Sequence, residues 1–127
     1  MKAPQVPVSW GELIDKITIL EIKSTRLSSD AARANVRKEL ELLRAKVDPN
    51  LAQRAALGHL KARLTEVNEA LWEIEDLIRE KENRAEFDGD FVAMARSVYK
   101  RNDERAAVKR EINRLLDSDI VEEKSYR

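Results

Sequence analysis

The residues of this 127-residue chain best suited to chemistry are polar side chains that interrupt an apolar helical pattern near the C-terminus. An apolar stripe that begins at Phe91 turns polar at Asn102, Arg105 and Lys109 and becomes apolar again at Ile112. Two cations and an amide that share one helix face are suited to binding a phosphate or a carboxylate.

A turn centred on Phe87 would fold the preceding helix back along this one, so that positions equally far from Phe87 meet. This pairing brings an aromatic ring, carboxylates and a further cation to the polar interruption. Lys16, on a basic flank of the first predicted helix, is a further cation that could face an anion. The candidate binding residues are Lys16, Trp72, Glu75, Asp76, Arg79, Arg96, Tyr99, Asn102, Arg105 and Lys109.

Two interpretations of this cluster stay open. In the first, it is a shallow site for a small anionic molecule or a polar contact surface for a partner. In the second, it is a hydrogen-bonded network that sets the register of the two helices, in which Arg105 pairs with Glu69 and Lys109 with Glu66. We favour the second, because charged helical hairpins commonly show this pattern.

The charges of the two helices support the pairing. Residues 66–90 contain ten acidic and three basic residues, and residues 96–114 contain seven basic and three acidic residues. Arg96, Asp103 and Arg110 also recur every seven residues and so share one face of the fourth helix. By the same charge logic, the mostly acidic tail should lie beside a basic group: Arg54, His59, Lys61 and Arg63.

Periodicity predicts an all-α protein, an antiparallel bundle of about four helices with a long hairpin formed by the third and fourth. The expected spine is a heptad stripe from Leu57 to Ile78, and Ser9 with Glu12 forms a capping box before the first helix. We predict one domain over residues 1–127, with an extended N-terminus at 1–8 and an acidic tail at 117–127. The predicted helices are 10–27, 31–47, 50–85 and 90–116.

Composition excludes several classes of site. The chain has no cysteine and one histidine, so we expect no disulfide, no metal site and no cofactor. Equal numbers of basic and acidic residues, 24 of each, disfavour a nucleic acid as partner. No apolar run is long enough for a membrane span, and the N-terminus lacks an apolar signal core, so we expect a cytoplasmic protein with no membrane partner.

Four motifs resemble a family of small helical proteins, mainly bacterial, that is classified as a domain of unknown function. The resemblance covers nearly the whole chain and implies a single helical domain without implying an activity. The motifs are GELIDKITILEIK (11–23), LWEIED (71–76), ARSVYKRNDERA (95–106) and VEEKSY (121–126).

Ile14, Asp15 and Arg26 are also similar to the first helix of all-helical chorismate mutases. The arginine expected just before the Ile-Asp pair is absent, since Gly11 and Glu12 stand there. The comparison therefore fails at an anion-binding position that such an enzyme requires.

The sequence favours a non-enzymatic helical interaction or scaffold module, with no catalytic residue assigned. Its partner is another protein or a second copy of the chain, because a long apolar stripe covered only by a short second helix predicts a homodimer. The alternative is binding or transformation of a small anionic metabolite at a polar site between the third and fourth helices.

Overall fold

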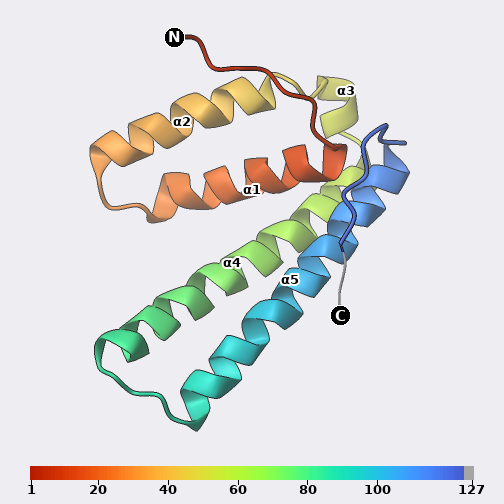
Figure 1. The fold of residues 1–127 in the computed structure, drawn as a ribbon. Coiled ribbons are helices and arrows are strands. Elements are labelled where there is room, and N and C mark those ends of the chain that lie inside the picture. The colour runs from red at the N-terminus through yellow and green to blue at the C-terminus, as the bar shows by residue number, and fades with distance from the viewer. Residues whose placement is uncertain (125–127) are drawn as a thin grey trace.

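The computed structural model describes residues 1–124, and within them all regular structure is helical (Figure 1). This confirms the predicted all-α class. The last three residues of the predicted tail and the end of the fourth motif lie outside the described part of the chain. The helices are α1 (Trp10–Arg26), α2 (Asp30–Arg44), α3 (Pro49–Ala52), α4 (Ala55–Asn83) and α5 (Gly89–Leu115).

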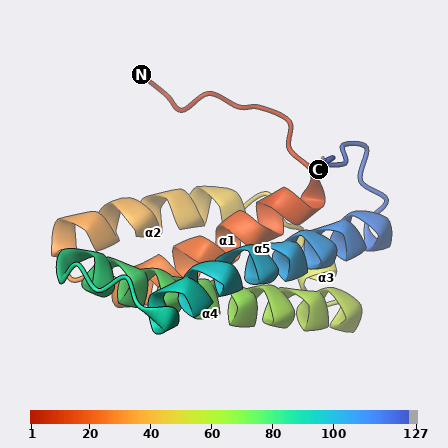
Figure 2. The same ribbon diagram turned by 60° about the horizontal axis from the view of Figure 1, so that its bottom comes forward.

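Helix α1 lies between α2 on one side and the α4–α5 hairpin on the other (Figure 2). Its apolar residues point in several directions, as a helix with contacts on more than one side requires. Ile14, Ile17 and Leu20 all belong to the main apolar core. The hydroxyl of Ser9 caps the helix by accepting a hydrogen bond from the backbone N–H of Glu12, as predicted.

Helices α4 and α5 form the predicted long antiparallel hairpin (Figure 1). The predicted α4 stripe is buried at Leu57, Leu64, Val67 and Leu71. The ion pair between Arg63 and Glu111 joins positions that are equally far from Phe87, so the predicted register of the hairpin is confirmed.

Two predictions about the helices are wrong. The predicted third helix is interrupted, because α3 ends after one turn and Arg54 has an extended backbone, with φ −66° and ψ 124°. The predicted packing of the second helix on the third also fails. Within the described residues, α2 has close backbone contacts only with α1, because α3 and the extended Arg54 separate it from the start of α4.

Burial is uneven along the hairpin. No residue between Leu71 and Ala106, a range that the structure describes completely, is fully buried. Ion pairs from α1 reach the hairpin as far as Glu73, which pairs with Arg26, and Arg105. We call residues 74–104 the distal hairpin, and the region where α1 crosses α4 and α5 the junction.

Candidate functional site: a charged junction of three helices

The junction is built around Asp15, whose side chain is completely buried in the middle of α1. Its carboxylate accepts hydrogen bonds from Arg105 Nε, at 2.9 Å from Oδ2 and 3.1 Å from Oδ1, and a further bond from Arg105 Nη2. The side-chain amide of Asn68 on α4 donates to Asp15 Oδ1 at 2.8 Å and to the Thr18 hydroxyl at 2.9 Å. One carboxylate therefore joins α1, α4 and α5.

The ion pair between Asp15 and Arg105 has the geometry that holds a buried charge. Burial opposes the charge of Arg105, but hydrogen bonds from the guanidinium to Asp15 and the nearby negative charges outweigh it, so the pKa of Arg105 is raised. An unpaired carboxylate at this depth would cost several kcal/mol. The described residues contain no buried side-chain nitrogen or oxygen without a hydrogen-bond partner, so the buried atoms of the network are all satisfied.

Lys109 lies one helical turn beyond Arg105 and joins α5 to two further segments. Its Nζ donates to Glu12 Oε2 at 2.6 Å and to Glu122 Oε2 in the tail at 2.7 Å. Burial opposes the charge of Lys109, but these two carboxylates raise its pKa overall. The hydrogen bond from Lys109 lowers the pKa of Glu122. The tail is therefore tied to the junction by an ion pair.

The start of α1 sits directly on the last turns of α5. The backbone N–H of Gly11 donates to Asn113 Oδ1 at 2.7 Å. A Cβ atom at Gly11 would lie 2.5 Å from the carbonyl oxygen of Lys109 and 3.0 Å from Asn113 Oδ1. The close approach therefore requires glycine at this position.

The predicted partners of the two cations are wrong. Arg105 and Lys109 turn toward α1 and the tail, not toward Glu69 and Glu66 of α4. The physical reason is that α1 packs against both helices of the hairpin, so these cations of α5 meet carboxylates of α1 and the tail. Within α5, Ala95 is exposed, whereas Val108, which the predicted stripe omits, is buried. The buried residues of α5 still include two polar ones, Lys109 and Asn113.

Two smaller predictions also need correction. Glu12 does not complete the capping box by binding back to Ser9, because its carboxylate binds Lys109. The tail does not pair with the basic group at the start of α4 within residues 1–124, since Glu122 binds Lys109, Lys61 binds Glu21 and Arg63 binds Glu111.

The structure disperses the other predicted site residues. Lys16 forms an exposed ion pair with Glu39 on α2, away from the hairpin. Glu75 lies 4.0 Å from Arg79 on the surface of α4. The remaining candidates stand on the hairpin outside the junction network: exposed Asp76, Arg96 and Tyr99, and half-buried Trp72 and Asn102.

A small groove does bring three of the candidates together. It has a volume of about 190 Å³, opens beside the junction, and Trp72, Glu75 and Arg105 are among its lining residues. Ile22 and Lys23 of α1 form the opposite wall. Arg105 binds Asp15 through Nε and Nη2, and no hydrogen bond within residues 1–124 uses its Nη1.

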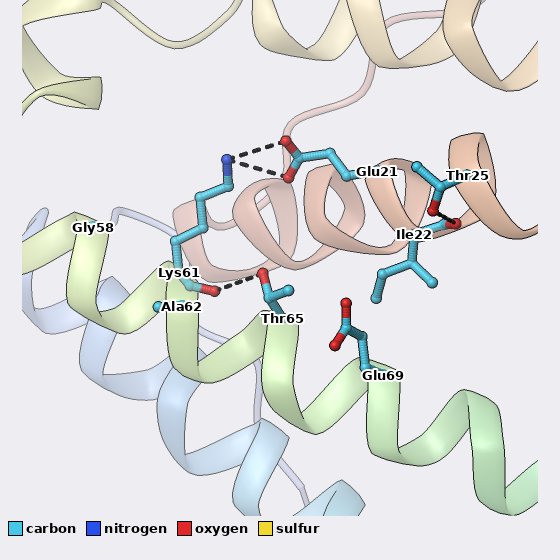
Figure 3. A pocket seen from close by; sticks show the side chains of 8 residues that line it. All are labelled: Glu21, Ile22, Thr25, Gly58, Lys61, Ala62, Thr65 and Glu69. Atoms are coloured by element: carbon cyan, nitrogen blue, oxygen red, sulfur yellow. Dashed lines mark hydrogen bonds and ion pairs between the residues drawn. The ribbon is translucent and has the colours of Figure 1, made fainter.

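A larger groove of about 460 Å³ lies between α1 and α4 (Figure 3). Glu21 forms an ion pair with Lys61 across this groove, at 3.2 Å. Arg44 of α2 binds the same carboxylate. The hydroxyls of Thr25 and Thr65 donate to backbone carbonyls of their own helices. The polar groups that Figure 3 shows with dashed lines are therefore engaged within the protein.

Sequence reasoning missed the residues at the centre of the junction: Asp15, Thr18, Asn68 and Gly11. A signal was present, because Asp15 and Thr18 interrupt a helix whose neighbouring positions are isoleucine and leucine. A charged residue surrounded by apolar positions on a helix with several contact sides needs a buried partner. The identity of that partner depends on how α1 crosses the hairpin, which periodicity does not define.

A comparison with protein families matches residues 4–127 to a family of unknown function, DUF6165. The chain belongs to this family. No match was found among curated proteins or among solved structures. None of the helices in residues 1–124 is long and apolar enough to cross a membrane, and no three acidic or histidine side chains there are grouped to hold a metal ion.

Proposed function

We propose that this protein is a non-enzymatic helical interaction module that binds another polypeptide through the distal hairpin. The observation that carries the proposal is the burial pattern. The distal hairpin continues for several turns beyond its last contact with α1 without a fully buried residue. It exposes large apolar side chains on both helices and in the loop between them: Leu77, Phe87, Val92 and Tyr99.

The physical argument is that helices in proteins are stabilised mainly by packing of their apolar faces. Two helices without a third element provide only one such contact. Phe87 and Phe91 pack edge to face in the loop region, with ring centroids 5.3 Å apart, but Phe87 itself remains exposed. Exposed apolar groups on a projecting element are typical of interaction surfaces.

The closed junction supports the same function. A catalytic or ligand-binding cluster needs a polar group that is free to meet its substrate. Instead, Asp15 is hydrogen-bonded to Asn68 and Arg105, and Lys109 is hydrogen-bonded to Glu12 and Glu122. Their arrangement fits a structural role, which holds the hairpin in place relative to α1.

Site-specific photo-crosslinking in the cells that produce the protein tests this proposal. A photoreactive phenylalanine analogue would replace Tyr99, which is 53% exposed in the distal hairpin, or Leu42, which is 55% exposed on α2. We expect a discrete crosslinked polypeptide from position 99 and none from position 42. Equal crosslinking at both positions, or none at position 99, would contradict the proposal.

The small groove supports a second candidate, binding of a small anionic metabolite. Lys23 lines the groove and has no ion-pair partner within residues 1–124, and Arg105 keeps Nη1 free beside it. Two cations next to the indole of Trp72 could bind a phosphate or a carboxylate that carries an apolar group.

Thermal denaturation with millimolar phosphate, sugar phosphates and dicarboxylates separates the two candidates. Lys23→Ala is the test variant. Lys16→Ala is its matched control, because Lys16 lies on the same helix but pairs with Glu39. We expect no increase in Tm beyond that of ionic strength alone. Stabilisation by one anion that is lost in Lys23→Ala and kept in Lys16→Ala would favour the metabolite.

A further inference from the structure

A regular stripe of exposed residues runs along the part of α5 that lies in the distal hairpin. Val92, Arg96, Tyr99 and Asp103 follow one another at spacings of four, three and four residues, so they share one helix face. All four are exposed, whereas Phe91, Met94 and Val98, at the neighbouring positions, are partly buried. We call these four residues the α5 outer stripe.

The two charged members of the stripe have no ion-pair partner within residues 1–124. At the hairpin loop, by contrast, Lys81 bonds both carboxylate oxygens of Asp88, at 3.0 and 3.1 Å. Arg96 and Asp103 are of opposite sign and lie seven residues apart, on either side of Tyr99. The stripe therefore combines apolar groups with an unused positive and an unused negative charge.

We propose that the α5 outer stripe binds the same stripe of a second copy of this chain, in antiparallel orientation. In an antiparallel pair with its two-fold axis between Tyr99 and Lys100, Arg96 and Asp103 are equally far from the axis. Each Arg96 then meets Asp103 of the second copy, and symmetry produces this ion pair twice. The two Tyr99 rings pack near the axis, and Val92 extends the apolar contact on both sides.

The alternating charges select this occupant and this orientation. A parallel pair would place Arg96 against Arg96 and Asp103 against Asp103, and such like-charge contacts are unfavourable. A uniformly acidic or basic partner would satisfy only one of the two charges. A second copy in antiparallel orientation satisfies both, which makes the surface complementary to itself. This inference rests on the proposed function, since it identifies the polypeptide that the distal hairpin binds.

Sedimentation equilibrium with charge-reversed variants tests the inference. We expect wild-type protein at about 10–100 µM to contain a species of twice 14.6 kDa. Arg96→Asp and Asp103→Arg each place like charges opposite one another, so each alone should weaken the dimer about tenfold or more. Lys38→Asp, at an exposed position of α2, is the control for charge reversal and should leave the dimer unchanged.

Recombining the charges makes the test specific. The double variant R96D/D103R exchanges the two charges and should dimerise again. An equimolar mixture of the two single variants should form a heterodimer, because all its cross-pairs are of opposite sign. A wild-type chain that remains at 14.6 kDa would overturn the inference. So would dimerisation that is equally strong in wild type and in both single variants.

The failure of this inference can be distinguished from the failure of the proposed function. If the crosslink from position 99 contains a different polypeptide and the wild-type chain stays monomeric, the interaction module stands and self-association fails. If position 99 crosslinks to nothing, both fail. A crosslinked product that contains two copies of this chain supports both.

Discussion

The junction and the distal hairpin are parts of the same two helices, and they differ in what surrounds them. At the junction, α1 covers α4 and α5, and the buried side chains include Leu64, Val108 and Ile112 together with the charged group around Asp15. In the distal hairpin the same helices continue with only each other as neighbours, and apolar side chains such as Val92 remain exposed. The hairpin therefore has buried side chains where α1 covers it and exposed apolar side chains where α1 does not.

Electrostatics differ between the two regions in the same way. At the junction, Asp15 and Lys109 connect segments that are far apart in the sequence: α1, α4, α5 and the tail. In the distal hairpin, the ion pairs of Lys81 with Glu86 and Asp88 join only residues of the connecting loop to the end of α4. Ion pairs therefore connect distant segments at the junction, and in the distal hairpin they stabilise only the local turn.

The largest expected effect comes from removing the central carboxylate. Asp15→Ala leaves Arg105 buried in part without its partner and leaves Asn68 with one fewer acceptor. Breaking a buried ion pair on one side costs about 3–5 kcal/mol. We expect urea denaturation to show a loss of this size. A loss below about 1 kcal/mol would mean that the junction is not the main source of stability.

Glycine substitutions compare the helix starts in the two regions. Gly11→Ala at the junction forces a Cβ atom against the backbone carbonyl of Lys109, which cannot move aside as a flexible side chain would, so we expect a cost of about 3 kcal/mol. Gly89→Ala, at the start of α5 in the distal hairpin, meets no atom within 4 Å and should be neutral or slightly stabilising. Equal effects in thermal or urea denaturation would contradict the contrast.

Two valines on α5 offer a third comparison. Val108 is 1% exposed at the junction, whereas Val92 is 53% exposed in the distal hairpin. Val108→Ala removes two buried methyl groups and should cost about 2 kcal/mol. Val92→Ala should change the unfolding free energy by less than about 0.5 kcal/mol, measured at a concentration where the chain is monomeric. A larger loss at Val92 would show that the distal hairpin has its own core.

Much of this arrangement could be predicted from local patterns. The heptad stripe of α4 predicts a helix with one apolar face, and a fold-back about Phe87 predicts the register that Arg63 and Glu111 confirm. The caps at Ser9 and Ser29 mark the starts of α1 and α2. These features depend on residues that are close in sequence or on a simple fold-back about Phe87.

The crossing of α1 over the hairpin could not be predicted in the same way. Periodicity places Arg105 and Lys109 on one face of α5, but it does not choose between α4 and α1 as the helix that supplies their partners. Helix packing, not periodicity, makes that choice. Asp15, the partner of Arg105, therefore lay outside the predicted site, which contained Arg105 and Lys109.

The smallest expected effect concerns the tail, which only the junction holds. Because the hydrogen bond from Lys109 lowers the pKa of Glu122, their contact is fully formed above the ordinary pKa of glutamate. It is lost as the pH falls through the lowered value. The pKa of Lys109 is raised, so this cation stays charged across that range and Glu122 is the group of the pair that titrates.

The backbone N–H of Trp10 reports this release, because it donates to the hydroxyl of Ser118 in the same tail. We expect its NMR resonance to shift on acidification with a midpoint below the ordinary glutamate pKa. Glu122→Gln should abolish this transition. Glu123→Gln, at the exposed neighbouring position, should leave it unchanged. A midpoint at or above the ordinary value would mean that Lys109 does not hold the tail. A transition that persists in Glu122→Gln would mean that the pair of Glu122 with Lys109 does not control the release.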